Sequence, residues 1–77
     1  MNINFAINEG SLILRKGLIS TAKLDSELLM SKIIEKDRKD IILYQNEKLN
    51  LRLYENFKFL INERLKRKPI AYLLGKK

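Results

Sequence analysis

Apolar side chains recur at helical spacing between residues 53 and 65. The stripe consists of five side chains: Leu53, Phe57, Leu60, Ile61 and Leu65. Intervals of four, three, one and four residues place all of them on one face of an α-helix. Asn50 precedes the stripe and is a residue type that caps helix N-termini. We therefore predict a long amphipathic helix that begins after Asn50 and ends near Arg67.

The N-terminal segment, residues 3–16, predicts another helix. One face carries three apolar side chains: Ile3, Ile7 and Leu14. Phe5 and Leu12 lie on roughly the opposite side, so this helix either begins late or is buried on two faces. Gly10 weakens its middle relative to alanine, and Gly17 is a natural C-terminal stop.

A third helix is predicted from Ser20-Thr21 to about residue 35. A hydroxyl at Ser20 or Thr21 can accept a hydrogen bond from a backbone N–H of the first turn. The apolar positions that follow are Leu24, Leu28, Leu29 and Ile33. Asp25 and Glu27 stand where the helix dipole favours acids. Because they are two residues apart they point to different sides, as expected of solvent-facing or first-turn charges rather than of an acid/base pair.

The rest of the chain divides into shorter pieces. A charged break over residues 35–40 leads to the apolar run 41–44, which we interpret as one or two helical turns. Pro69 is favoured at the first position of a helix, so residues 70–74 predict a short helix closed by Gly75. The 77 residues thus predict a single all-α domain, a small bundle of about five helices of which two or three are long.

The chain contains no cysteine and no histidine. A disulfide and a thiolate nucleophile are therefore excluded, and the side chain most often used as a general base or metal ligand is missing. The three glycines, at positions 10, 17 and 75, lie too far apart to form a phosphate or dinucleotide loop. We predict no catalytic residue, no cofactor site and no metal site in this chain. Without a secretory signal or a long apolar run, we expect it to be cytoplasmic and not bound to a membrane.

The formal net charge of +7 is concentrated at the C-terminal end. Residues 64–77 carry six cations and no acid: Arg64, Lys66, Arg67, Lys68, Lys76 and Lys77. Such a patch can steer an acidic partner, either protein or nucleic acid. Cations at a helix C-terminus also complement the helix dipole, which is a purely structural explanation. A helix-turn-helix reader contacts bases from the N-terminal part of its second helix, so this placement argues against DNA recognition.

Two stretches resemble the N-terminal domain of HemK/PrmC-type release-factor glutamine methyltransferases. Residues 64–75, RLKRKPIAYLLG, have the arginine, the basic spacer and the Pro, Tyr and Gly spacing found at the end of that domain. Residues 24–29, LDSELL, resemble its second helix, and Gly17-Leu18 with Ala22 precede it at the distance familiar in the family. The resemblance covers nearly the whole chain. The family usually has a glycine and often an acid before the proline, whereas this chain has Arg67 and Lys68 and is more basic there.

The resemblance implies a domain that helps to recognise and orient a peptide chain release factor. The parent enzyme methylates the Gly-Gly-Gln glutamine of that factor with S-adenosylmethionine. The family continues into a linker and a catalytic domain, so we expect residues 1–77 to be an N-terminal domain that is inactive in isolation. The resemblance implies two sets of contact residues. The candidates for contact with the release factor are Arg64, Lys66, Arg67 and Lys68, and the candidates for docking on the catalytic domain are Pro69, Tyr72 and Gly75.

Alternatives stay open at this point. The chain could be a stand-alone basic helical module that binds nucleic acid, which a steep salt dependence of binding would reveal. It could also be a purely structural cap on a neighbouring domain. For Pro69, Tyr72 and Gly75 in particular, a helix start, a packed tyrosine and a helix end explain the pattern as well as docking does.

Overall fold

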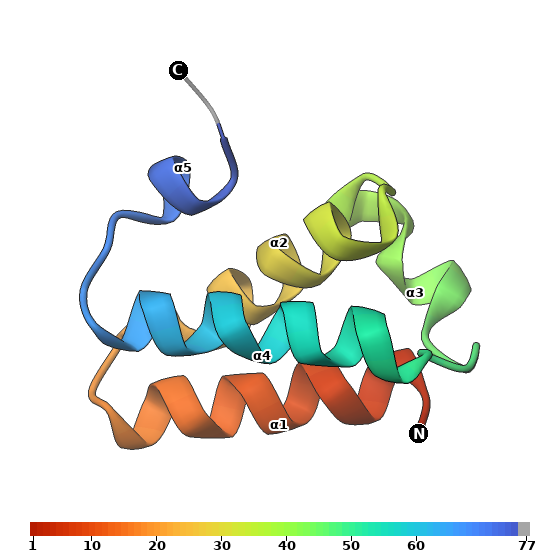
Figure 1. The fold of residues 1–77 in the computed structure, drawn as a ribbon, viewed down its shortest axis with the longest axis horizontal. Coiled ribbons are helices and arrows are strands. Elements are labelled where there is room, and N and C mark those ends of the chain that lie inside the picture. Colours follow the sequence, from red (N-terminus) through yellow and green to blue (C-terminus); the bar gives the residue numbers. More distant parts are fainter. Residues whose placement is uncertain (76–77) are drawn as a thin grey trace.

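The computed structural model describes residues 1–75, which contain five α-helices joined by turns (Figure 1). The elements in chain order are α1 (Ile3–Lys16), α2 (Ala22–Ile34), the 3-10 turn η1 (Arg38–Asp40), α3 (Ile41–Tyr44), α4 (Leu51–Leu65) and α5 (Ile70–Leu73). The predicted all-α bundle, with three long helices and two short ones, is confirmed. The helix predicted to reach Arg67 ends at Leu65, because the backbone of Arg67 has a left-handed φ of 75° that a helix cannot continue.

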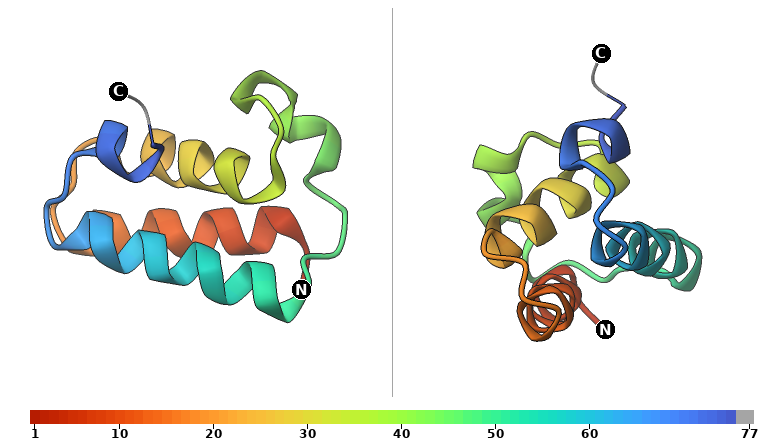
Figure 2. Two further views of the ribbon diagram at one scale, coloured as in Figure 1. Left: turned by 45° about the horizontal axis from the view of Figure 1, so that its top comes forward. Right: turned by 90° about the vertical axis from the view of Figure 1, so that its left-hand side faces the viewer.

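The helices are arranged so that α1 and α4 run in the same direction and α2 runs back beside them (Figures 1 and 2). The C-termini of α1 and α4 and the N-terminus of α2 therefore lie together. We call this end, residues 15–21 and 64–69, the basic end of the bundle. The N-termini of α1 and α4 lie with residues 45–49 at the other end, and we call residues 1–4 and 45–51 the opposite end.

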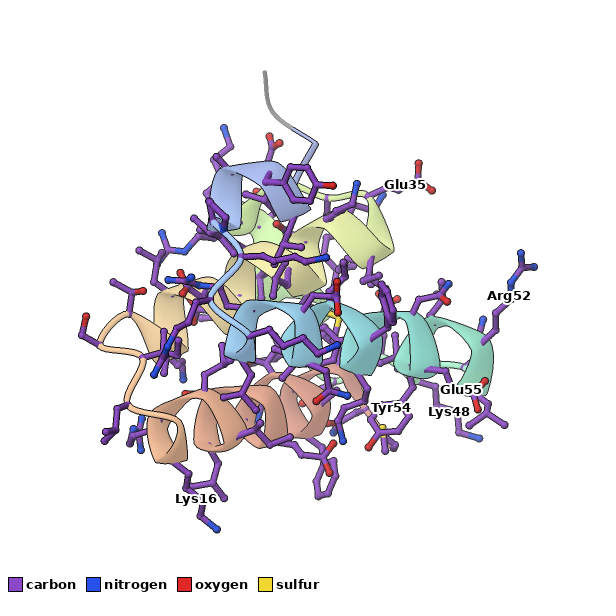
Figure 3. The ribbon with its side chains drawn as sticks, turned by 60° about the vertical axis from the view of Figure 1, so that its left-hand side comes forward. Lys16, Glu35, Lys48, Arg52, Tyr54 and Glu55 are labelled. Atoms are coloured by element: carbon purple, nitrogen blue, oxygen red, sulfur yellow. The ribbon has the colours of Figure 1, made fainter. Side chains whose placement is uncertain are left out.

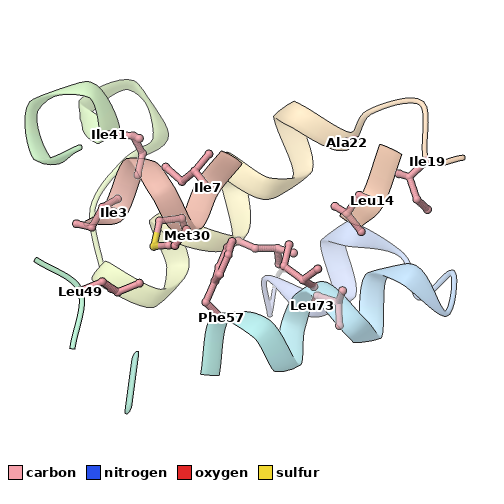
Figure 4. Close-up of a cluster of buried hydrophobic side chains, with 13 residues drawn as sticks. Ile3, Ile7, Leu14, Ile19, Ala22, Met30, Ile41, Leu49, Phe57 and Leu73 are labelled. Atoms are coloured by element: carbon pink, nitrogen blue, oxygen red, sulfur yellow. The ribbon is translucent and has the colours of Figure 1, made fainter. Parts of the chain in front are cut away.

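The core forms where the apolar faces of α1, α2 and α4 meet (Figure 4). Phe57 and Ile61 of α4 are fully buried, and Leu53, Leu60 and Leu65 pack against the same cluster, so the predicted stripe is confirmed. The N-terminus of α4 is capped as predicted, because Asn50 Oδ1 accepts a hydrogen bond from Leu53 N at 2.8 Å. The buried apolar side chains of the whole cluster are Ile3, Ala6, Ile7, Leu14, Ile19, Ala22, Leu29, Met30, Ile41, Leu49, Phe57, Ile61 and Leu73.

Helix α1 starts at once and is buried on one face. Asn2 caps it, since its Oδ1 accepts a hydrogen bond from Phe5 N at 2.8 Å. Phe5 and Leu12 are exposed on the outer side of the helix. The structure therefore supports neither of the two explanations that we offered for these side chains, a late start or a second buried face.

Gly10 is a contact point between helices rather than only a weak point in α1. A Cβ atom at this position would lie 2.7 Å from Ser26 Oγ and 2.8 Å from side-chain atoms of both Phe57 and Ile61. Carbon atoms pack at about 3.5–4.0 Å, so any side chain here would force α2 and α4 away from α1. The glycine thus permits the close approach of the three long helices.

The buried face of α2 is rotated from the one predicted. Leu24 is exposed, whereas Asp25 and Ser26 are buried. Ser26 Oγ donates a hydrogen bond to the backbone oxygen of Ile7 at 2.7 Å, which satisfies the buried hydroxyl. We predicted that a hydroxyl at this position accepts a hydrogen bond from a backbone N–H of the first turn. Thr21 makes no such cap and instead donates from Oγ1 to Asp25 Oδ2 at 2.8 Å. Of the two explanations offered for Asp25, a solvent-facing charge is wrong, whereas a charge in the first turn of α2 is confirmed.

The opposite end is closed by backbone hydrogen bonds. Ile3 N donates to Glu47 O at 2.9 Å, and Leu49 N donates to Met1 O at 3.1 Å. The side chains of Leu49 and Ile41 are buried beneath these bonds. The sequence analysis did not anticipate this pairing between the N-terminus and the segment before α4.

Candidate interaction surface

Arg64 fastens the end of α4 to α2. Its Nε donates to Asp25 Oδ2 at 2.8 Å, and its Nη1 donates to the backbone oxygen of Lys68 at 3.0 Å. Asp25 is only 2% exposed and the Arg64 side chain 19%, so the pair is largely shielded from water. A buried carboxylate is tolerated only with such partners, and Thr21 supplies a second one. The guanidinium that we predicted to contact a partner is thus engaged in internal contacts.

Two lysines share the carboxylate of Glu63. Lys68 Nζ donates to Oε1, and Lys66 Nζ donates to Oε2 at 3.2 Å. The hydrogen bonds from Lys68 and Lys66 lower the pKa of Glu63, and the hydrogen bond to Glu63 raises the pKa of Lys68. The Lys66 side chain is 70% exposed and extends to solvent from the turn after α4.

Arg67 joins the two turns of the basic end. Its Nη2 donates to the backbone oxygen of Gly17 at 2.8 Å. Arg67 has φ 75° and Leu18 has φ 65°, a left-handed conformation that costs a residue with a side chain about 1–2 kcal/mol. In residues 1–75 the remaining non-glycine residue of this kind is Glu35, which ends α2. The basic end therefore contains two residues with a strained backbone, Leu18 and Arg67, and the hydrogen bond from Arg67 to Gly17.

The left-handed residue in this turn is Leu18 and not the glycine before it. A Cβ on Gly17 would lie 2.1 Å from Leu65 Cδ1, so the glycine is needed for space and not for its own φ of −84°. The prediction that Gly17 ends α1 is confirmed. The sequence analysis did not anticipate the exposure of Leu18, which at 86% is the most exposed large apolar side chain in the described part of the chain.

Arg15 and Lys16, at the C-terminus of α1, add to the charge of the basic end. Figure 3 shows Lys16 extending from the end of that helix. Within residues 1–75, no ion pair includes Arg15, Lys16 or Arg67. The surface thus combines cations from two segments, the end of α1 and the turn after α4. The hydrogen bond from Arg67 to Gly17 joins these segments across 50 residues of sequence. Sequence reasoning found only the second segment. Lys76 and Lys77, which belong to the predicted patch, lie outside the described residues.

Helix α5 packs Leu73 onto the core and turns Tyr72 outward. Leu73 is buried, whereas Tyr72 is 68% exposed, with Lys68 Nζ 6.0 Å from the centre of its ring. The explanation in which Tyr72 packs between the helix start and the helix end is therefore wrong. Pro69 precedes the first turn of α5 as its N-cap, and Gly75 follows it with φ 74°. These two residues shape the turns that flank the exposed tyrosine.

A shallow groove of about 430 Å³ lies between α5 and the C-terminal half of α2. Its lining residues are Leu28, Ser31, Lys32, Glu35, Lys36, Asp37, Arg38 and Leu74. Cations and acids alternate along this wall, so it favours no single charge. In residues 1–75 no three acidic side chains gather as a metal site would require. None of the helices described has the length and the apolar character needed to cross a membrane.

Comparison with known proteins identifies a family. The profile of the family described as "PrmC N-terminal domain" matches residues 6–75. Three curated relatives are similar to this chain. The release factor glutamine methyltransferase of Coxiella burnetii is 39% identical over 57 residues, which cover 74% of this chain and 21% of that protein. A bifunctional methyltransferase of Rickettsia felis is 33% identical over 74 residues, which cover 96% of this chain and 14% of that protein.

The third relative is the release factor glutamine methyltransferase of Clostridium botulinum, 33% identical over 67 residues, or 87% of this chain and 24% of that protein. The chain therefore spans less than a quarter of the length of the curated relatives that it matches. No solved structure gives a significant match to the chain.

Proposed function

The chain belongs to the PrmC N-terminal domain family, and on that premise we propose that it is the release-factor recognition domain of a release factor glutamine methyltransferase. The observation that carries the proposal is the family match over residues 6–75, together with two relatives named for this activity. In the proposal, the domain binds the peptide chain release factor and orients it for a catalytic domain outside these 77 residues.

The chemistry is assigned to that catalytic domain. It would bind S-adenosylmethionine and transfer the methyl group to the glutamine of the Gly-Gly-Gln motif. The present chain would contribute binding energy and orientation, which lower the barrier by positioning the reacting groups. In this proposal it has no catalytic residue and holds no cofactor.

Contact with the release factor is proposed for the cations of the turn after α4. Lys66, Arg67 and Lys68 are exposed there, while Arg64 would act indirectly by holding the turn through Asp25 and the Lys68 carbonyl. Exposed cations steer an acidic partner and raise its association rate. Docking on the catalytic domain is proposed for Pro69, Tyr72 and Gly75, with Tyr72 as the exposed side chain that the neighbouring domain covers.

The binding proposal is tested by titrating the chain with purified release factor from the same organism at low salt. Replacement of Lys66 by glutamate should weaken binding several-fold and reduce its salt dependence, since one ionic contact is lost. The control is Arg52→Glu, a charge reversal on an exposed side chain of α4 near the opposite end (Figure 3). Absence of binding by the native chain, or equal loss in both variants, would contradict the proposal. Binding to RNA instead would support the nucleic-acid alternative.

The docking proposal has its own test. In the methyltransferase that contains this chain, Tyr72→Ala should lower both the melting temperature of the joined domains and the rate of release-factor methylation. Because Tyr72 makes few contacts within the bundle, the isolated chain should melt at an unchanged temperature. Unchanged activity and unchanged melting in the whole enzyme would show that Tyr72 is not covered by the catalytic domain.

A further inference from the structure

We propose that Leu18 and the cations around it, Arg15, Lys16 and Arg67, form a docking point for an acidic segment of the release factor that presents an apolar side chain. This inference rests on the proposed function. It extends the contact surface from the turn after α4 to the end of α1, which the sequence resemblance did not assign to any contact. Three observations carry it.

The first observation is that Leu18 is held outward at a cost. Its side chain is 86% exposed and its φ is 65°, so the residue gains almost nothing from burial and adopts a backbone conformation that leucine disfavours. Asparagine or glycine would adopt this conformation more easily. A strained residue whose side chain is almost wholly exposed contributes little to the stability of its own fold, and such strain often accompanies function.

The second observation is that hydrogen bonds hold the turn that carries Leu18. Leu18 N donates to Arg15 O and Ile19 N donates to Leu14 O, both at 3.0 Å. Arg67 Nη2 donates to the carbonyl oxygen of Gly17. These contacts define the backbone conformation that presents the leucine, and a conformation formed before binding lowers the entropy lost on association.

The third observation is the combination of charge and apolar surface. Arg15 and Lys16 precede Leu18, Arg67 touches the carbonyl before it, and these three cations form no ion pair in the described part of the chain. Carboxylates would complement them. A nucleic acid would also complement the charge, but its apolar surface lies mainly on flat base faces, which stack on aromatic side chains, and no aromatic side chain belongs to this set. A protein segment can place a carboxylate and an aliphatic side chain side by side, so the surface favours an acidic protein segment.

The test is the affinity of purified release factor for four single variants of the chain, measured by calorimetry or fluorescence anisotropy at fixed salt. Leu18→Asn removes the apolar contact with a residue that tolerates a positive φ, so the variant should melt at the same temperature as the native chain or higher. Its matched control is Leu51→Asn, because Leu51 is 69% exposed at the opposite end. Lys16→Glu is paired with Lys48→Glu, and Figure 3 shows these two lysines on opposite sides of the bundle.

We expect Leu18→Asn and Lys16→Glu each to weaken binding by about tenfold, a typical loss for a central contact residue, and both controls to leave binding unchanged. If the native chain binds and Leu18→Asn binds equally well, this inference is overturned while the proposed function stands. If the native chain does not bind the release factor at all, both are overturned. Equal binding of native chain and Leu18→Asn to a single-stranded RNA, with none to the release factor, would also overturn the inference.

Discussion

The two ends of the bundle are closed by different means. At the opposite end, backbone hydrogen bonds join residues 1–3 to residues 47–49, and the apolar side chains of Leu49 and Ile41 are buried beneath them. At the basic end, Arg64 and Arg67 bind acceptors on distant segments, while Leu18 is strained and exposed. Both ends connect the same two parallel helices, α1 and α4.

The difference shows where buried contacts gather and where cationic and apolar groups stay exposed. The opposite end buries apolar area and satisfies its backbone, which is how a domain of this size stabilises its fold. The basic end keeps apolar and cationic groups at the surface and fixes their positions with arginine contacts. We infer that the opposite end serves folding, whereas the basic end also serves binding and is itself held in place by the Asp25–Arg64 pair. The predictions below test the contacts on which this comparison rests, from the largest expected effect to the smallest.

The largest contrast is expected between two leucines. Leu49→Ala removes a buried side chain at the opposite end and should lower the free energy of unfolding by about 2–4 kcal/mol. Leu18→Ala removes an exposed side chain at the basic end and should change it by less than about 0.5 kcal/mol. Urea denaturation monitored by circular dichroism measures both. Equal losses in the two variants would show that the ends do not differ in this way.

The second contrast lies between two ion pairs. Asp25→Ala leaves the shielded Arg64 without its carboxylate and should cost about 2–3 kcal/mol, below the range for a fully buried pair because Arg64 retains some access to water. Glu27→Ala breaks the pair with Arg38, which is more exposed and should cost about 0.2–1 kcal/mol. Chemical denaturation of both variants provides the comparison. A cost below about 1 kcal/mol for Asp25→Ala would mean that this pair does not fasten the basic end.

The smallest effect is a pH dependence located at Glu63. Its pKa lies below the ordinary value of 4.5 because Lys68 and Lys66 donate to its carboxylate. A carboxyl whose pKa is lowered on folding stabilises the fold above its unfolded pKa, and this contribution is lost as the pH falls through the lowered value. The stability difference between the native chain and Glu63→Gln should therefore be larger at pH 7 than at pH 2.5. Thermal melting at the two pH values tests this, and a difference independent of pH would contradict the assignment.

Much of the fold could be predicted from local patterns. The stripe from Leu53 to Leu65, the cap at Asn50 and the stop at Gly17 depend on residues close in sequence, and all three were confirmed. The buried face of α2 could not be predicted in this way. Asp25 is buried with Arg64, which is 39 residues away, and Ser26 with the Ile7 carbonyl. Counting apolar residues therefore finds the buried Leu29 but misses the polar residues on the inner face of the helix.

The candidate surface was predictable only in part. The cations from Arg64 to Lys68 are adjacent in the chain and therefore visible as a cluster. Arg15, Lys16 and Leu18 join them only because α1 and α4 run in the same direction, which periodicity does not reveal. The charge of a folded surface depends on topology as well as on composition. The contact roles assigned to these residues stay predictions.

The most direct test of the division between the two ends is an NMR titration of the ¹⁵N-labelled chain with unlabelled release factor. The account predicts that shifted or broadened backbone amides cluster at residues 15–19 and 66–72, with residues 1–4 and 45–51 unaffected. Perturbations concentrated at the opposite end, or spread evenly over the bundle, would contradict the claim that recognition belongs to the basic end.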